Sequence, residues 1–455
     1  MASSLIFILL IGLTGWIAFR EYGRIIRNIR LGQDETISGD RSQRWQNVLL
    51  VAFGQKKMFA NLIPAILHLF IYVAFLLTQI ELIEILVDGF VGTHRIFAPF
   101  LGGFYTFLIS FIEILSVLAL VATVAFLLRR NVLNVPRFKK PEMKGWPSRD
   151  ANLILFGEIL LITGIFSMNG ADVLLQQALP EHYHATGPLA ISSWLGPMFF
   201  GNLDVPTLQV IERFGWWLHL IVVLGFITYL PFSKHLHILF AFPNTYFAPL
   251  SPRGQMENMP AIMNEVKSMM GLATDQPAME AGADIPEFGA HDVTQLSWRN
   301  ILEAYSCTEC GRCTSVCPAN ITGKKLSPRK VVMSVRDRAD DIGRKIDSGN
   351  PQWVREDLRQ EGVHLTASNF SDGQSLFDLV SPEEIHACTT CNACVEACPV
   401  LINPLDTILK LRRYEILTQS AGPADWLPLF NSLENAGSAW QIAQDRDHWT
   451  KGINQ

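Results

Sequence analysis

All eight cysteines of this 455-residue chain fall into two runs with the same spacing, and a proline follows each run. The runs are Cys307-x2-Cys310-x2-Cys313-x3-Cys317 and Cys388-x2-Cys391-x2-Cys394-x3-Cys398. Three thiolates in a short irregular loop can surround one iron–sulfur cubane, while the fourth, three residues on and followed by proline, is directed towards a neighbouring cubane. The spacing therefore predicts two [4Fe–4S] clusters.

The fourth cysteine of each run is expected to serve the cluster of the other run. The first cluster would have the ligands Cys307, Cys310, Cys313 and Cys398, and the second would have Cys317, Cys388, Cys391 and Cys394. Structural zinc and a redox-active dithiol are the alternatives. Zinc commonly takes paired Cys-x2-Cys motifs separated by a spacer, and a dithiol would not use all eight cysteines. Because no cysteine remains for a disulfide, the chain is expected to face a reducing compartment.

The two cysteine runs repeat at an offset of 81 residues, which indicates an internal duplication. Each is followed by a helix start of the same chemistry, Ser327-Pro328 after the first and Asn403-Pro404 after the second. We therefore expect a mainly helical, ferredoxin-like dicluster domain over residues 296–455. Residues 244–295 are rich in Pro, Met, Gly and acidic residues and are predicted to form a connector.

The part of the chain before residue 244 is strongly apolar. The whole chain is 49% hydrophobic and 17% charged, with a mean hydropathy of +0.22, and its net charge of −5 gives no reason to expect nucleic acid. Each of five apolar stretches approaches the ~20 residues that cross a bilayer as a helix. They are roughly Leu5 to Phe19, Met58 to Ile80, Phe104 to Leu128, Ala151 to Met168 and Phe214 to Phe232. The predicted fold is all-α, with a five-helix transmembrane bundle over residues 1–243.

Positive charge predicts how these helices are oriented. Cations are concentrated between Arg20 and Lys57 and between Arg129 and Arg149, whereas the alternate loops are nearly free of them. By the positive-inside rule the N-terminus is outside and the cysteine domain lies in the cytoplasm, at a bacterial inner membrane. The first apolar stretch has no basic residues before it, so we interpret it as a retained helix rather than a signal peptide.

Histidines inside apolar stretches are candidate cofactor ligands, because ionisable groups in the bilayer are costly. His68 is expected about ten residues, or ~15 Å, from the cytoplasmic end of its helix, and His219 at a comparable depth. We predict that His68 and His219 are the axial ligands of a haem b. The alternative is that these imidazoles only make hydrogen bonds between helices.

A second haem is a further possibility on the cytoplasmic side. His237 follows His219 by eighteen residues, which is five helical turns, so the two project from one face. Met58 has a suitable depth to be the other ligand, since His/Met ligation is known for haem iron. His237, next to His235, is equally explained as an interfacial residue. In the outer loops, His94 and Arg95 are either contacts for a quinone headgroup or interfacial anchors, and the quinone site stays undetermined.

The membrane part resembles a known family. Trp217-Leu-His219, followed by Leu230-Pro-Phe-Ser-Lys234-His-Leu-His237, is similar to the last spanning helix of the nitrate reductase gamma subunit family. That resemblance implies five helices, an outside N-terminus and haem b. It places His219 and His237 on the C-terminal haem ligands and His68 on one ligand of the second helix, while the other ligand position falls on Met58.

The cysteine part resembles the C-type subunit of heterodisulfide reductase and the iron–sulfur subunits of anaerobic glycerol-3-phosphate dehydrogenase. The segments that carry the resemblance are Cys310-Gly-Arg-Cys313, Leu326-Ser-Pro-Arg329, Asn403-Pro-Leu-Asp406, Arg412-Arg-Tyr414 and the tail from Leu433 to Trp449. The fused architecture resembles electron-transferring-flavoprotein:menaquinone oxidoreductases. In many such relatives a cysteine-rich CCG domain follows, whereas this sequence stops at Gln455. The resemblance therefore implies a separate CCG-domain subunit, similar to the B-type and D-type subunits of heterodisulfide reductase.

The expected function is that of an electron-transfer subunit in a quinone-linked membrane oxidoreductase. Electrons would run between a cytoplasmic donor, two cubanes, haem b and menaquinone, with electron-transferring flavoprotein as the implied donor. Heterodisulfide, lactate or glycerol-3-phosphate partners would use the same cofactors. A membrane-bound redox sensor and a pure anchor are alternatives of other classes; no output domain is visible for the first, and intramembrane histidines are superfluous in the second.

Overall fold

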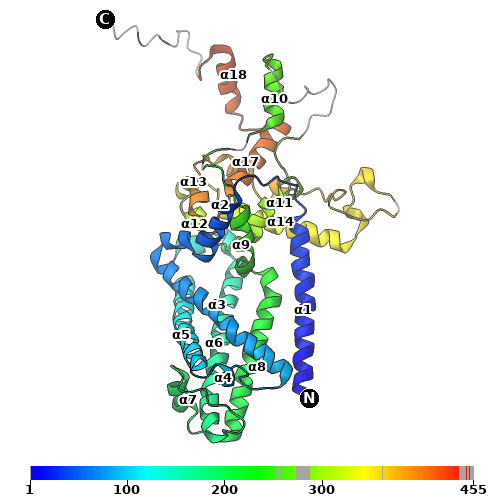
Figure 1. Ribbon diagram of the computed structural model, residues 1–455. Helices are drawn as coiled ribbons and strands as arrows, with labels where there is room; N and C mark the ends of the chain where they lie inside the picture. Colours follow the sequence, from blue (N-terminus) through cyan, green and yellow to red (C-terminus); the bar gives the residue numbers. More distant parts are fainter. Residues whose placement is uncertain are drawn as a thin grey trace.

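The computed structural model describes residues 2–252, 254–256, 258–272, 287–360, 362–439, 447 and 450. Parts of the predicted connector (244–295) and of the tail (433–449) lie outside these residues. Figure 1 shows a bundle of long helices with a domain of shorter helices at one end, and the N-terminus at the opposite end. Among the described residues there is no strand, only two isolated β-bridges, so the all-α prediction is confirmed.

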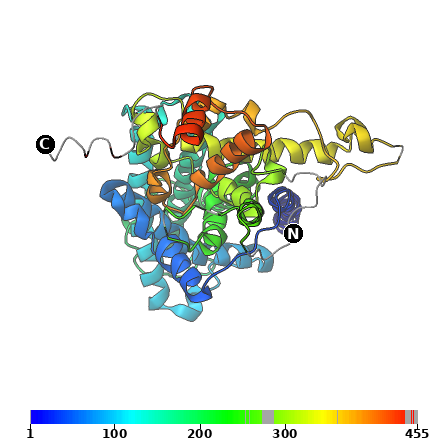
Figure 2. The same cartoon turned by 90° about the horizontal axis from the view of Figure 1, so that it is seen from above.

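Five helices are long and apolar enough to cross a membrane, which confirms the predicted number of spans. They are α1 (Ala2–Ile29), α3 (Leu62–Val91), α5 (Gly103–Asn131), α6 (Trp146–Ala178) and α8 (Val205–Tyr229). Helix α1 stands at the side of the others (Figures 1 and 2). The short helices α4 (Ala98–Leu101) and α7 (Ser192–Phe200) lie at the end of the bundle away from the cysteine domain, which we call the far end (Figure 1).

Several helix boundaries differ from the prediction, and two of them affect the candidate sites. Helix α1 continues ten residues beyond Phe19, because its arginines gain partners: Arg24 and Arg27 both pair with Asp347 of the cysteine domain. Helix α3 begins at Leu62 rather than at Met58, which lies in a preceding 3-10 turn, η2 (Lys56–Ala60). The later start places His68 only six residues, or about 9 Å, inside the helix, closer to the cysteine domain than predicted.

Helix α8 ends at Tyr229, and the chain then makes two 3-10 turns, η5 (Leu230–Phe232) and η6 (Lys234–Leu236), before α9 (His237–Phe247). Ser233 has an extended backbone between the two turns. The five-turn argument that placed His219 and His237 on one face assumed a continuous helix. Because the helix stops between them, the facing of His237 is set by the turns and not by helical periodicity.

The cysteine domain is a set of short helices around one core. Its main elements are α11 (Trp298–Tyr305), α12 (Arg312–Ser315), α13 (Pro318–Ile321), α14 (Pro328–Ser348), α15 (Pro382–His386), α16 (Ala393–Ala397) and α17 (Pro404–Arg413), and α10 (Pro260–Met269) and α18 (Trp426–Ala436) lie above it (Figure 1). The Ser327 side chain accepts from the backbone N–H of Lys330, and Asn403 accepts from that of Asp406. Both predicted helix starts are therefore capped as expected.

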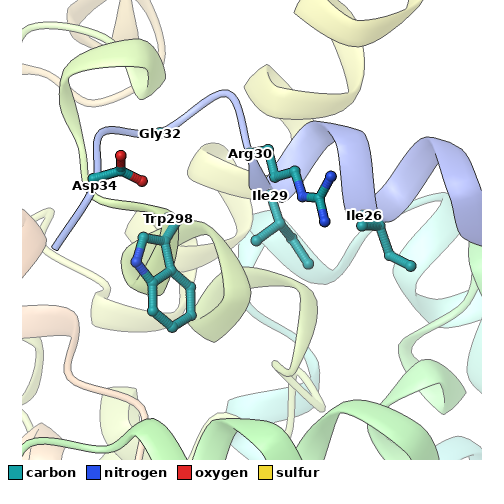
Figure 3. A pocket seen from close by; sticks show the side chains of 6 residues that line it. All are labelled: Ile26, Ile29, Arg30, Gly32, Asp34 and Trp298. Atoms are coloured by element: carbon teal, nitrogen blue, oxygen red, sulfur yellow. The ribbon is translucent and has the colours of Figure 1, made fainter. Parts of the chain in front are cut away.

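The loop after α1 joins the membrane bundle to the cysteine domain. Gln33 forms a parallel bridge with Ser297: its N–H donates to the Leu296 carbonyl at 2.8 Å and its carbonyl accepts from Trp298 at 3.0 Å. Gly32 is needed there, because a Cβ atom would lie 2.6 Å from the Trp298 nitrogen. Figure 3 shows the open cavity beside this bridge, with Asp34 near the Trp298 ring and Ile29 between that ring and Arg30.

Candidate cofactor sites

The first cysteine cavity is built from both cysteine runs. Cys307, Cys310 and Cys313 of the first run and Cys398 of the second line one cavity. Short helices hold them: α12 carries Cys313, and α16 ends immediately before Cys398. Backbone N–H groups point at two of the sulfurs, from Glu309 to Cys307 at 3.4 Å and from Ile402 to Cys398 at 3.3 Å.

The second cysteine cavity has the complementary composition. Cys317 of the first run lines it together with Cys388, Cys391 and Cys394 of the second. Each run thus contributes three thiols to one cavity and its last thiol to the other, which is the crosswise grouping that the spacing predicts.

The backbone of the two loops repeats as closely as their sequence. Glu309 and Thr390, at equivalent positions, have φ of 52° and 56°, and Gly311 and Asn392 have φ of 70° and 60°. These left-handed residues turn successive sulfurs towards the same side. Gly311 is also needed for space, because a Cβ atom would lie 2.3 Å from Nη1 of the buried Arg329.

Burial keeps these thiols protonated unless they bind a positively charged metal centre. Desolvation raises the pKa of Cys307, Cys394 and Cys398 to about 12, so without a metal they would be neutral at pH 7. Among the described residues, no three His, Cys, Asp or Glu side chains converge on the position of a single metal ion. The four thiols of each cavity are instead spread around its walls, an arrangement that fits a cubane cluster with one iron per thiolate.

An ion pair joins the first cysteine cavity to the turn before His237. Glu309, between Cys307 and Cys310, pairs with Lys234 and accepts from Arg336 at 2.8 Å. Burial alone would raise the pKa of the Glu309 carboxyl, but the cations Arg336 and Lys234 hold it below its usual value. The Lys234 carbonyl lies 3.0 Å from Nδ1 of His237, so this pair connects the cluster loop directly to a histidine of the bundle.

Arg312 makes the equivalent connection to the segment before His68. Arg312 lies between Cys310 and Cys313 in the sequence. Its guanidinium donates to the backbone carbonyls of Lys57 and Met58 at 3.1 and 3.4 Å. Gln55, just before them, has its Oε1 3.1 Å from Nδ1 of His68. Both loops between the cysteines of the first cavity therefore touch the segments that hold His68 and His237.

His68 lies next to His237 in the structure, whereas the prediction places His68 and His219 on one haem. His68 faces His237, with ring centroids 6.4 Å apart, whereas among the described residues it has no ring contact with His219. Bonds of about 2 Å from one iron to a nitrogen on each side place two imidazole centroids roughly 6 Å apart. The observed separation of His68 and His237 fits one iron between them. The reason for the difference is the later start of α3 and the break after α8.

The three candidate histidines share one feature of metal ligands. In each of them Nδ1 lies close to an oxygen. The distance is 3.1 Å from His68 to the Gln55 side chain, 3.3 Å from His219 to the Leu161 carbonyl, and 3.0 Å from His237 to the Lys234 carbonyl. Histidine ligands normally donate one ring N–H to such an oxygen, which turns the other nitrogen to the metal. Met58 is half-buried, and its backbone carbonyl, not its sulfur, is the group with a described partner in the cysteine domain.

Sequence reasoning missed several residues of these sites. Lys234, Glu309 and Arg312 flank the predicted ligands, but no pattern in the sequence shows which cation meets which anion across the two domains. The acidic residues near the ends of the spanning helices, including Glu81 of α3 and Asp172 of α6, were also missed, because they lie just beyond the predicted apolar stretches.

The comparisons with known proteins agree with the cysteine cavities. Residues 306–402 match the family described as 4Fe-4S dicluster domain. The chain is 28% identical over 442 residues to the "Probable iron-sulfur-binding oxidoreductase FadF" of Bacillus subtilis, covering 92% of this chain and 57% of the relative. It is 26% identical over 412 residues to the "EtfAB:quinone oxidoreductase" of Syntrophomonas wolfei, covering 88% and 53%.

A third relative matches over a shorter part of the chain. It is the "Probable membrane-anchored ferredoxin" of Chromohalobacter salexigens, 29% identical over 175 residues, which are 38% of this chain and 26% of the relative. No solved structure matches. The chain spans about half the length of the first two relatives. It is thus a helical protein with five candidate membrane helices and a C-terminal 4Fe-4S dicluster domain, and its similar proteins are iron–sulfur oxidoreductases.

Proposed function

We propose that this chain is the membrane electron-transfer subunit of a quinone-linked oxidoreductase. The observation that carries the proposal is the placement of the first cysteine cavity. It lies against the membrane bundle, where Glu309 and Arg312 connect it to the segments of His237 and His68. A cluster domain that served only as an anchor or sensor would not need contacts from its cysteine loops to a facing pair of histidines.

The groups would be held as follows. The first cysteine cavity and the second cysteine cavity each hold one [4Fe–4S] cluster through their four thiolates, and His68 and His237 hold a haem b. When bound, these groups supply one-electron redox chemistry. His219 stays a candidate ligand of a second haem, with its Nδ1 already held by the Leu161 carbonyl; neither His68 nor Met58 is its partner in this proposal.

The two cavities differ in how far they open to solvent, and this difference supports an order in which electrons pass through them. Cys391 of the second cysteine cavity is exposed, whereas the thiols of the first are half-buried or buried. The second cavity therefore faces the electron donor, and the first faces the bundle. We assign electron-transferring flavoprotein as the donor, acting through a CCG-domain subunit that docks beside Cys391, and menaquinone as the membrane substrate. The relative that is named an EtfAB:quinone oxidoreductase supports this choice.

The charge distribution supports a cytoplasmic cysteine domain at a bacterial inner membrane. Arg130, Arg137 and Lys234 lie at the end of the bundle that contacts this domain. No Lys or Arg occurs between Ala171 and Ile211, in the segment that leads over the far end. Cations accumulate on the cytoplasmic side, so the N-terminus and the far end face outwards.

Difference spectra of purified full-length protein test this function. We expect reduced-minus-oxidised spectra to show a haem b that is oxidised by a menaquinone analogue, together with iron for two clusters. His68→Ala and His237→Ala should both abolish this haem, while His219→Ala should leave it in place. A wild-type protein without haem, or one whose haem exchanges no electrons with quinones, would refute the proposal. Equal haem loss in His68→Ala and His219→Ala, with normal haem in His237→Ala, would instead restore the pairing predicted from sequence.

A further inference from the structure

The segment between the first two spanning helices exposes a group of large apolar side chains. It consists of α2 (Arg41–Asn47), the π-helical turn η1 (Val48–Phe53) and the 3-10 turn η2 that precedes α3. Four large side chains of α2 and η1 have exposed fractions between 47% and 58%: Trp45, Leu49, Leu50 and Phe53. Single exposed apolar residues are ordinary, but a group of them marks a surface that meets a membrane or another protein.

The opposite side of this segment is fixed to the protein. Arg44 is buried, and its guanidinium donates to the backbone carbonyls of Tyr246 and Ala248 at 2.9 and 3.2 Å. Val48, one turn after Arg44, is buried as well. Because these contacts hold the inner side, the apolar side chains of the outer side are held in a fixed direction, away from the protein.

The exposed apolar side chains continue into the surface of a spanning helix. Leu62 and Ile63 are the first two residues of α3, and they are 61% and 75% exposed. The segment joins two spans, so it lies where α1 and α3 leave the bilayer. Figure 1 places α2 at the end of the bundle that meets the cysteine domain. The apolar side of the segment is therefore continuous with apolar surface that contacts acyl chains.

Positive charge flanks the apolar group. Arg41 and Lys56 have exposed side chains, and neither side chain has a hydrogen bond or ion pair among the described residues. Residues 41–60 contain no Asp or Glu. Asp40, just before them, accepts from the backbone N–H groups of Ser42 and Gln43 as a helix cap. Cations beside an apolar face are the pattern by which interfacial helices bind anionic lipids.

We propose that residues 41–60 bind the surface of a membrane that contains anionic phospholipid. The exposed apolar side chains enter the boundary between headgroups and acyl chains, where an indole such as that of Trp45 is favoured, and Arg41 and Lys56 bind lipid phosphates. Lipid is favoured over a protein partner because this face is continuous with the side of α3 that contacts acyl chains. The surface does not depend on the cofactors or on the direction of electron flow.

The same segment reaches the candidate cofactor sites. Gln55 is buried with a left-handed φ of 50°, and its Oε1 lies 3.1 Å from Nδ1 of His68. The carbonyls of Lys57 and Met58 accept from Arg312 of the first cysteine cavity. Binding of the segment to the membrane surface therefore holds in place the residues that position His68 and this cavity.

The test uses full-length protein in nanodiscs with equal amounts of phosphatidylglycerol and phosphatidylcholine. Leu49→p-benzoylphenylalanine places a photo-crosslinking group on the apolar face, and mass spectrometry of the illuminated protein identifies the adducts. We expect lipid adducts at a yield within about twofold of that from the same substitution at Ile63, in the span. Phosphatidylglycerol adducts should exceed phosphatidylcholine adducts by about twofold or more.

The matched control is the same substitution at Leu427 of α18. Its side chain is as exposed as that of Leu49, at 63% against 58%, but α18 lies above the cysteine domain, away from the bundle (Figure 1). It should give about tenfold fewer lipid adducts than Leu49, because an exposed apolar side chain outside the bilayer meets water. Arg41→Gln combined with Lys56→Gln should keep the Leu49 adducts and remove the preference for phosphatidylglycerol.

The adducts decide whether this surface binds lipid. If Ile63 gives lipid adducts and Leu49 gives none, or if Leu49 crosslinks to a second copy of the chain, the proposal is overturned. Adducts that follow the bulk lipid ratio overturn the assignment of Arg41 and Lys56 to phosphates. Leu50→p-benzoylphenylalanine must give the same result as Leu49, and it decides the matter if the Leu49 variant does not fold.

Discussion

The two cysteine cavities have the same thiol spacing and the same left-handed turns, but their surroundings differ. The first is enclosed by buried ions: Arg329 has no exposed surface and pairs with Glu142, and Glu309 pairs with Lys234. The second lies at the protein surface, with Cys391 exposed and the exposed pair of Lys325 and Glu383 beside it. The two runs thus share the chemistry of their ligands, while one cavity is buried against the membrane bundle and the other opens to solvent.

The largest effect is expected from removing a thiol that one cysteine run contributes to the cavity of the other run. Cys398→Ala should remove the first cluster although this residue belongs to the second run, because its thiol lines the first cavity. The electron paramagnetic resonance spectrum of Cys398→Ala should match that of Cys310→Ala, and iron should fall to about half, since one of two cubanes is lost. A spectrum that matches Cys391→Ala instead would show that each run holds its own cluster.

A large loss of stability is expected when an ion pair of the first cavity is broken. Arg329→Met removes the 2.7 Å partner of the half-buried Glu142, which keeps only the hydrogen bond from the Ser327 hydroxyl, and should destabilise the domain by about 1–3 kcal/mol. Thermal loss of cluster absorbance measures the change. Lys325→Ala is the control beside the second cavity, where both side chains of the pair are more than half exposed, and it should leave the midpoint unchanged. Equal midpoint temperatures in the two variants would show that the ion pairs at the two cavities do not differ in their contribution to stability.

The equivalent left-handed residues should differ in tolerance. Gly311→Ala meets both a φ of 70° and the Arg329 guanidinium, so we expect it to destabilise the domain by about 1–3 kcal/mol. Asn392→Ala meets the unfavourable φ of 60° without such a clash, loses the 3.2 Å hydrogen bond to the Thr390 carbonyl, and should destabilise the domain by ~1 kcal/mol. The same thermal measurement compares them. If Asn392→Ala proves the more damaging change, the first cavity is the less crowded of the two.

A smaller effect is expected on reduction potentials. Arg312→Gln removes a cation beside the first cavity and should lower the potential of that cluster by ~60 mV, equivalent to ~1.4 kcal/mol for one electron. Arg412→Gln is the matched change at the second cavity, where Arg412 donates to the Cys388 carbonyl at 2.7 Å. Potentiometric titration followed by electron paramagnetic resonance should show each variant shifting its own cluster. A shift of both clusters by either variant would mean that the cavities are not electrostatically separate.

The sequence was informative where the signal is local. Cysteine spacing, the caps at Ser327 and Asn403, and the five apolar stretches all depend on neighbours in the chain, and the structure agrees with them. The proximity of the His68 and His237 rings could not be predicted, because it depends on where α3 begins and on the break at Ser233. The contact of Arg312 with Met58 joins residues far apart in sequence, and no local pattern encodes it.

The mixing of the two runs in each cavity also limits when the clusters can be inserted. Neither set of four thiols is complete until the second run has been synthesised, by which time all five spanning helices have already left the ribosome. The bundle is therefore available first, and the cysteine domain closes on it late, through contacts that span a long loop of chain. A cell that lacks iron at that moment would be left with a membrane-inserted helix bundle and an unclosed cysteine domain.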